Sequence, residues 1–228
     1  MKKALLYVVL LSVVFGRSQN PFNRIRADLK AYSSTALLDS CAAKNYCPDS
    51  VYFYKTLAHL KKGELSQAKK NYKTLAKLYP DFKEIHYLNG MLLFSDQNYG
   101  RSVSEFNLAI KANPSNVKAL YNRSVAFGVM DEYLSAIEDL DACIRLNPEY
   151  VLAYYSRAYW YEFTGNYVEA VKDYEQTIKL DPGNYDAYLG VAYVYQNLGE
   201  PAKACDALTR AIKEGSQVAA ELKDIFCK

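Results

Sequence analysis

Apolar positions follow a repeating pattern along most of this chain, with a period of 34 residues. Four prolines at that spacing mark it: Pro80, Pro114, Pro148 and Pro182. In the second half of every 34-residue stretch, apolar residues recur at i, i+4 and i+8, which is the periodicity of a helix with one buried face. Between about Asp49 and Val218 the chain is therefore predicted to consist of repeated helical segments.

The period divides this stretch into five repeats, with the bounds 49–82, 83–116, 117–150, 151–184 and 185–218. The eighth and twentieth residues of every repeat are small, so two helices can approach closely there. The twenty-fourth is large and mostly apolar: Tyr72, Phe106, Leu140, Tyr174 and Leu208. A mid-repeat turn carries glycine in three repeats and Gln97 or Asp131 in the other two, and glycine suits a helix end that needs a positive φ. Each repeat is therefore predicted to be two antiparallel helices joined by a tight turn.

This pattern strongly resembles the tetratricopeptide repeat, whose period and small/large positions match over residues 49–218. The resemblance implies an all-α fold, a right-handed α-solenoid of antiparallel helix pairs with helical caps. A helical array of another family is the alternative. Two features depart from the family pattern. Ser216 replaces the closing proline of the fifth repeat, and other residues replace the early tryptophan: Tyr52, His86, Leu120, Tyr154 and Tyr188.

The two ends of the array are predicted to be caps, because a solenoid needs polar-faced terminal elements to stay soluble. Residues 19–48 fit the repeat poorly and are interpreted as a degenerate repeat, with the N-terminal helical cap over Pro21–Lys44. Residues 217–228 are predicted to form a C-terminal capping helix.

Residues 1–18 have the character of a secretory signal peptide. Lys2 and Lys3 precede an apolar stretch from Ala4 to Phe15, and cleavage is expected after Ser18 or, alternatively, after Gly16. The apolar stretch is shorter than the roughly 20 residues that span a bilayer, although an uncleaved anchor is the alternative. We therefore expect an exported bacterial protein, periplasmic or secreted, with no membrane insertion after cleavage.

The charge balance changes once this segment is removed. The whole chain has 28 basic and 25 acidic residues. The first 18 residues contain three bases and no acid, which leaves 25 of each sign in the remainder. A balanced chain lacks the basic surface of nucleic-acid-binding proteins, so a nucleic-acid partner is not expected.

Five cysteines are present in a chain whose expected export favours disulfides. Cys205 and Cys227 lie 10 residues before and 12 after a turn near Gly215, so an antiparallel helix hairpin would place them side by side. A Cys205–Cys227 disulfide is predicted, with two separate buried thiols as the alternative. Cys41 and Cys47 are expected to form a second, short disulfide. Cys143 is interpreted as a buried packing residue.

The family resemblance places ligands on the concave side, which is lined by the first helix of each repeat. Aromatic residues recur at the fifth and ninth positions of these helices, and eight residues are predicted to line a ligand groove: Phe53, Tyr87, Met91, Tyr121, Asn122, Tyr155, Tyr159 and Tyr193. Such a groove would suit an extended peptide or an amphipathic helix, or a glycan stacked on the rings. The alternative is that these side chains only pack between helices.

Catalytic and metal-binding patterns are not found in the sequence. His59 and His86 fall at core positions of different repeats and are interpreted as structural. The acidic residues Glu138, Asp139 and Asp141 lie on a second helix and are interpreted as solvated. No phosphate loop, nucleophile motif or paired metal motif is present. We therefore expect no enzyme activity, no cofactor and no metal.

Some tetratricopeptide proteins hold the C-terminal carboxylate of heat-shock chaperones with a clamp of lysine, arginine and asparagine. In the matching positions this chain has only Asn122, with Tyr87 and Met91 before it and Leu152 and Ser156 after it. A chaperone adaptor is therefore disfavoured. The sequence predicts a protein–protein interaction scaffold of the cell envelope. A glycan-binding protein, or a structural spacer in an assembly or secretion machine, is the alternative.

Overall fold

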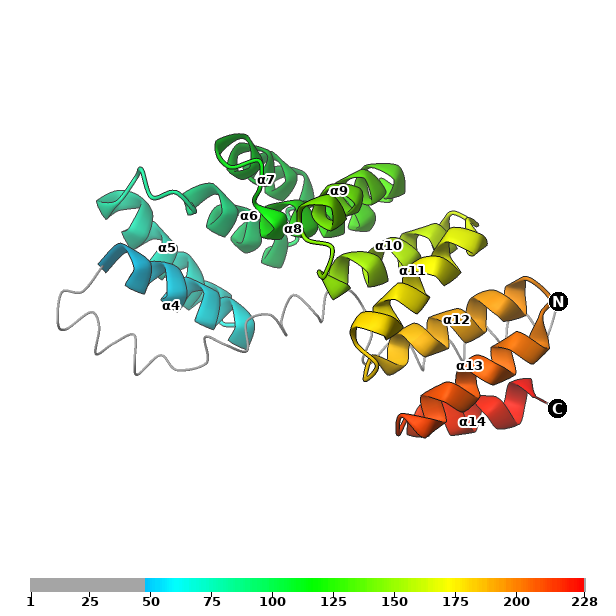
Figure 1. Cartoon of the computed structure of the whole chain (residues 1–228). Helices are drawn as coiled ribbons and strands as arrows, with labels where there is room; N and C mark the ends of the chain where they lie inside the picture. The colour runs from blue at the N-terminus through cyan, green and yellow to red at the C-terminus, as the bar shows by residue number, and fades with distance from the viewer. Residues whose placement is uncertain (1–47, 228) are drawn as a thin grey trace. The chain divides into compact units, whose positions relative to one another are not determined.

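The computed structural model describes residues 48–227, which form helices joined by short turns (Figure 1). The predicted signal peptide, the N-terminal cap and the Cys41–Cys47 pair lie outside these residues. The helices are α4 (Pro48–Lys62), α5 (Leu65–Leu78), α6 (Ile85–Ser95), α7 (Tyr99–Ala112), α8 (Val117–Val129), α9 (Tyr133–Leu146), α10 (Val151–Phe163), α11 (Tyr167–Leu180), α12 (Tyr185–Asn197), α13 (Pro201–Lys213) and α14 (Gln217–Phe226).

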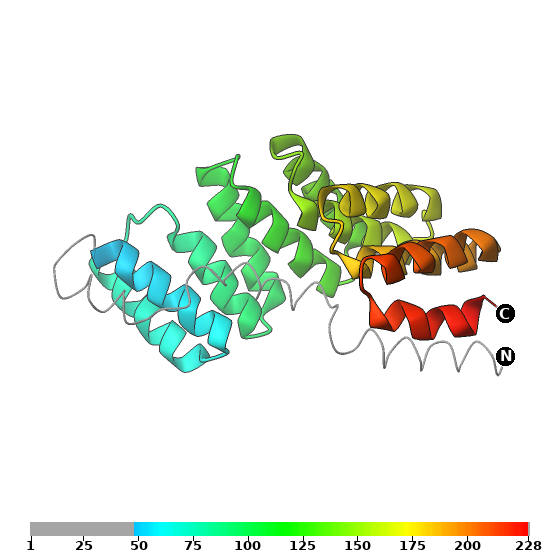
Figure 2. The same ribbon diagram turned by 60° about the horizontal axis from the view of Figure 1, so that its bottom comes forward.

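The chain separates into two compact units after Met130. We call residues 48–130, with α4 to α8, the N-terminal lobe, and residues 131–227, with α9 to α14, the C-terminal lobe. Within each lobe consecutive helices pack as hairpins, such as α4 with α5 and α12 with α13 (Figure 2). The all-α fold of consecutive helix pairs predicted from the sequence is confirmed.

All five mid-repeat turns adopt the left-handed conformation. Gly63, Gly165 and Gly199 have φ between 72° and 76°, and Gln97 and Asp131 have φ of 60° and 61°. The prediction that this position ends a helix with a positive φ is confirmed, including at the two repeats without glycine. L side chains rarely adopt this φ. Glycine therefore takes this conformation without backbone strain, whereas Gln97 and Asp131 adopt it with some strain.

Small residues form the contact points between helices, as the sequence predicted. The twentieth residues are all fully buried: Ala68, Ser102, Ala136, Ala170 and Ala204. Two glycines allow an even closer approach of neighbouring helices. A Cβ atom at Gly90 would lie 2.6 Å from the Phe106 ring, and one at Gly190 would lie 2.5 Å from the Tyr174 ring. These two glycines make room for large buried rings on the neighbouring second helix.

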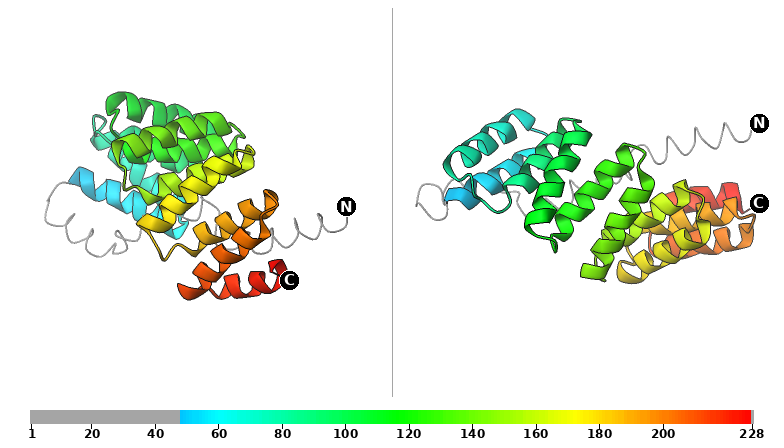
Figure 3. Two further views of the ribbon diagram at one scale, coloured as in Figure 1. Left: turned by 45° about the vertical axis from the view of Figure 1, so that its right-hand side comes forward. Right: turned by 90° about the horizontal axis from the view of Figure 1, so that it is seen from above.

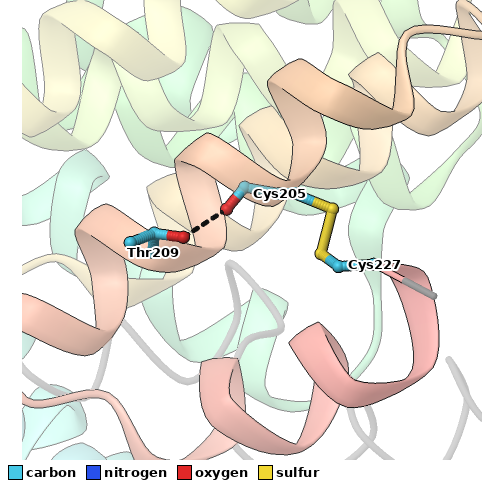
Figure 4. The surroundings of a disulfide bond; sticks show 3 residues. All are labelled: Cys205, Thr209 and Cys227. Atoms are coloured by element: carbon cyan, nitrogen blue, oxygen red, sulfur yellow. Dashed lines mark hydrogen bonds between the residues drawn. A yellow bond between two sulfur atoms is a disulfide. The ribbon is translucent and has the colours of Figure 1, made fainter.

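The C-terminal end of the C-terminal lobe is closed by α14, which packs beside α13 (Figure 3). The structure joins Cys205 to Cys227, the pair expected from the hairpin spacing, with 5.7 Å between the two Cα atoms (Figure 4). Thr209 donates a hydrogen bond to the carbonyl oxygen of Cys205 at 2.7 Å. Cys143 is buried and is not in a disulfide. Within residues 48–227, every helix is too short or too polar to cross a bilayer.

Candidate binding surface

Most of the predicted groove is interior. Five of its eight residues are at most 8% exposed: Tyr87, Met91, Tyr121, Asn122 and Tyr155. Their surroundings explain why. The ring centroids of Tyr87 and Phe106 are 6.1 Å apart, and Asn122 Nδ2 donates hydrogen bonds to the Tyr87 hydroxyl at 3.3 Å and to the Lys118 carbonyl at 2.8 Å. For these five residues the packing interpretation describes the structure, and only Phe53, Tyr159 and Tyr193 remain partly exposed.

In the C-terminal lobe, Tyr159 belongs to a compact group with an acidic side chain. The Tyr174 hydroxyl of α11 donates a hydrogen bond to Glu162 Oε2 of α10 at 2.9 Å. The rings of Tyr155 and Tyr174 meet edge to face, with centroids 5.7 Å apart. We call Tyr155, Tyr159, Glu162 and Tyr174 the Glu162 cluster. Spacings of four and three residues place its three α10 members on one side of that helix.

The surroundings of Glu162 disfavour its charged form. Burial raises the pKa of Glu162 to about 7, against an opposing effect of the hydrogen bond from Tyr174. Burial, reinforced by the nearby carboxyl, also raises the pKa of Tyr159, and it raises that of Tyr174 well above its usual value. Within the described residues no lysine, arginine or histidine pairs with Glu162. The carboxyl therefore lies beside Tyr159 and Tyr174 and lacks a counter-charge among the described residues.

A second aromatic group adjoins Tyr159. Tyr133, Tyr159, Trp160 and Phe163, which we call the aromatic edge, have ring centroids 4.8 to 6.1 Å apart. Phe163 is 58% exposed, whereas Trp160 is buried and its Nε1 has no acceptor among the described residues. The exposed apolar ring of Phe163 therefore follows directly after Glu162 along α10.

The equivalent positions of α12, which contacts α10, carry a comparable pair of side chains. Tyr193 and Gln196 occupy the ninth and twelfth positions of their repeat, as Tyr159 and Glu162 do in theirs, and both are partly exposed. The C-terminal lobe therefore presents a first-helix surface made of Tyr159, Glu162, Phe163, Tyr193 and Gln196. We refer to it as the α10–α12 face.

The second-helix acids differ from the expectation that they are solvated. Only Glu138 is exposed, while Asp139 is 5% exposed. Arg157 Nη1 donates to Asp141 Oδ1 at 2.6 Å, and its Nε and Nη2 donate to the two carboxylate oxygens of Asp173 at 2.6 and 2.8 Å. The sequence interpretation was wrong for Asp139, which is buried. Asp141 keeps a side-chain exposure of 39% but is paired with Arg157 of the following first helix.

The two histidines pair locally with acids. His59 Nδ1 lies 2.5 Å from Glu64 Oε2, and His86 Nδ1 lies 2.8 Å from Glu105 Oε2. Residues 48–227 contain no group of three histidine, cysteine, aspartate or glutamate side chains arranged to hold a metal ion. His59 lies in α4 and His86 in α6, so the two histidines belong to different helix hairpins of the N-terminal lobe.

Each lobe also has a shallow hollow that is lined by residues other than those of the α10–α12 face. One, of about 360 Å³, is lined by residues of α11, α12 and α13 and contains the Arg210–Glu175 ion pair. The other, of about 500 Å³, lies along α5 and is lined by Lys69, Lys70 and Lys73 with Ser66 and Tyr72. Both are open to solvent, and charged residues make up half of the first lining and three of the five residues of the second.

Sequence reasoning missed Glu162, Phe163 and Tyr174 as members of the surface or its support. A signal was present for the first of them. Repeat position 12 is occupied by Leu60, Phe94, Gly128, Glu162 and Gln196, so the carboxyl stands where other repeats have apolar or neutral residues. Tyr174 gave no such signal, because its role depends on a neighbouring helix.

Comparisons with known proteins agree with this geometry. Two family models described as tetratricopeptide repeat match residues 57–117 and 164–224. No curated protein matches the sequence.

Three solved structures illustrate the likeness. The crystal structure of MamA protein is 24% identical, with a TM-score of 0.63, and the match covers 73% of this chain and 91% of that one. YrrB, described as a TPR protein with an unusual peptide-binding site, is 19% identical, with a TM-score of 0.62 and coverages of 84% and 100%. The first TPR of Spaghetti (RPAP3), bound to the HSP90 peptide SRMEEVD, is 25% identical, with a TM-score of 0.50 and coverages of 51% and 93%.

Proposed function

Because this chain belongs to the tetratricopeptide repeat family, we propose that it is a non-catalytic interaction scaffold that binds a peptide segment of a partner protein. The α10–α12 face of the C-terminal lobe is the proposed binding surface. The observation that carries the proposal is the partly exposed Tyr159, which lies one helical turn from two side chains: the exposed ring of Phe163 and Glu162, a carboxyl without a positive partner among the described residues. Aromatic side chains of this kind dominate the energetics of protein interfaces.

Structures of similar fold support the class of ligand. A peptide-binding site is described for YrrB, and RPAP3 is described with a bound HSP90 peptide. The acidic peptide of the RPAP3 complex does not suit the proposed surface, because an incoming carboxylate would meet Glu162. This agrees with the incomplete carboxylate clamp around Asn122 in the sequence.

Export is the second part of the proposal. The Cys205–Cys227 disulfide of the C-terminal lobe supports it, because disulfides persist mainly in oxidising compartments outside the cytosol. The mass of the protein recovered from its source organism checks this part. A chain that begins at Gln19 or Arg17 agrees with export through a cleaved signal, and a chain that retains residues 1–16 contradicts it.

The binding surface can be tested with a displayed library of random 12-residue peptides, selected on the purified chain with its disulfide formed. Binding of the selected peptides is then measured by fluorescence polarisation against Tyr159→Ala and Tyr195→Ala. Tyr195 is the matched control, because it lies on α12 beside Lys203 of α13 and lines the hollow whose residues are not those of the proposed face.

We expect Tyr159→Ala to weaken binding tenfold or more, since truncating an aromatic anchor costs on the order of 2 kcal/mol, and Tyr195→Ala to change it less than twofold. Equal losses in both variants, or selection of no specific peptide, would contradict the proposal. Saturable binding of a polysaccharide that depends on Tyr159 would instead support the glycan alternative.

A further inference from the structure

We propose that the α10–α12 face recognises a cationic side chain, lysine or arginine, of the bound segment, and that Glu162 is the residue that holds it. This inference rests on the proposed function and specifies the chemistry of the partner. It means that the partner segment is basic, in contrast to the acidic peptide bound by RPAP3.

The immediate surroundings of Glu162 are suited to a cation. Its Oε2 accepts one hydrogen bond, from Tyr174, and the described residues supply no positive partner. A carboxylate has about four lone-pair sites, so acceptor capacity remains for an ammonium or guanidinium group. Tyr159 lies one helical turn away, and aromatic faces attract cations electrostatically.

A metal ion fits this place poorly. Calcium and magnesium take several oxygen ligands, and the described residues include no cluster of acids, histidines or cysteines at Glu162. A lysine or arginine side chain needs only one carboxylate for its charge, and it has an apolar stem that packs on tyrosine rings.

The carboxyl at this position is costly for the free protein. Glutamine has nearly the same shape and would also accept the hydrogen bond from Tyr174, yet it would avoid burying a charge. A local feature that costs stability without an evident structural gain is typical of a functional site. A cation from a partner would supply the missing charge compensation.

The charge of the whole lobe acts in the same direction. Residues 131–227 contain 17 acidic and 8 basic side chains, a formal net charge of −9. A field of this sign attracts basic segments and raises their rate of encounter. Long-range attraction and the local carboxyl therefore favour the same class of partner.

The test uses two tripeptide probes that differ only in charge, acetyl-Gly-Lys-Gly-amide and acetyl-Gly-norleucine-Gly-amide, titrated into the full chain at low salt. Binding is followed by NMR through the ring signals of Tyr159 and Tyr193. The variants are Glu162→Gln and, as a control that removes one exposed charge from the same lobe, Glu138→Gln.

We expect the lysine probe to bind the parent at least fivefold more tightly than the norleucine probe, with a dissociation constant on the order of millimolar. Glu162→Gln abolishes this preference, and Glu138→Gln keeps most of it. The inference is overturned if the two probes bind the parent alike, including no detectable binding of either, or if Glu162→Gln retains the preference.

The outcome is separable from that of the library selection. If the selected peptides lose affinity in Tyr159→Ala but bind the parent and Glu162→Gln equally well, that result would support the proposed binding surface and contradict the cation site. Preferential binding of the lysine probe, without selection of any specific peptide, would support the cation site and contradict the peptide-binding surface.

Discussion

The two lobes share one repeat pattern and differ in charge. Residues 48–130 contain 12 basic and 6 acidic side chains, a formal net charge of +6, whereas residues 131–227 have a net charge of −9. The near balance of the whole chain therefore results from cancellation between two oppositely charged regions. An overall charge excludes a partner class only if the charge is spread evenly, and here it is not.

The lobes also differ at the ninth repeat position, one of the positions predicted from the family resemblance to line a ligand groove. The ninth residues of the N-terminal lobe, Leu57, Met91 and Val125, are at most 4% exposed, whereas Tyr159 and Tyr193 of the C-terminal lobe remain partly exposed. The hollow of the N-terminal lobe lies instead along the lysines of α5. The same scaffold thus presents an aromatic, acidic face in one lobe and a basic second helix in the other.

The largest difference we expect between the lobes comes from the disulfide. A bond between residues 22 apart contributes about 3 kcal/mol to the free energy of unfolding. Cys205→Ala/Cys227→Ala should therefore lower the stability measured in urea by about that amount and remove the sensitivity of the C-terminal lobe to reductant.

Hydrogen exchange resolves where this effect falls. Loss of amide protection confined to the C-terminal lobe, α13 and α14 above all, would sharpen the distinction between the lobes. An equal loss of amide protection in α4 to α7 would show that the two lobes unfold together, which would contradict a difference in stability between them.

A somewhat smaller effect is expected at Arg157. Burial acts to lower the pKa of its guanidinium, but the hydrogen bonds to Asp173 and Asp141 outweigh burial, raise the pKa and keep the group charged. Arg157→Met leaves Asp173, only 6% exposed, without these bonds. We expect a loss of about 2.5 kcal/mol in urea denaturation, since an uncompensated buried charge costs several kcal/mol.

Arg210→Met provides the comparison within the same lobe. Its ion pair with Glu175 is more than a third exposed on both sides, and such pairs are worth less than about 1 kcal/mol. If both variants lose the same stability, burial of Asp173 is not what makes the Arg157 contacts important.

An effect smaller than that of Arg157→Met is expected from the pH dependence that Glu162 gives to the stability of the C-terminal lobe. The pKa of this carboxyl is about 7 in the folded state and near 4.5 when unfolded. Between these values the folded state binds the extra proton, so stability falls as the pH rises and the full penalty is present above pH 7. One pKa unit corresponds to about 1.4 kcal/mol, and partial solvent screening reduces the total to about 2 kcal/mol.

Glu162→Gln isolates this contribution. The variant should match the parent near pH 4 and be more stable than the parent by about 2 kcal/mol at pH 8, as measured by urea denaturation across that range. A parent and variant with parallel stability curves would show that the surroundings of Glu162 do not disfavour its charge.

The sequence by itself determined the repeat, the helix pairs and the closure of the C-terminal end. These features depend on short-range spacing: small residues at the helix contacts, turn positions with positive φ, and two cysteines about equally far from one turn. Each is fixed within a single helix hairpin, so a pattern along the chain is enough to predict it.

Only the tertiary structure decided which aromatic residues of the predicted groove are buried and which stay partly exposed. Tyr87, Tyr121 and Tyr155 share one repeat position and were indistinguishable from surface residues by spacing alone, but the structure buries all three. Tyr174 reaches Glu162 because Gly190 on the following helix leaves space for its ring. Burial and the resulting pKa are properties of several helices together, and a periodic sequence specifies which residues share a face but not how deeply neighbouring helices cover it.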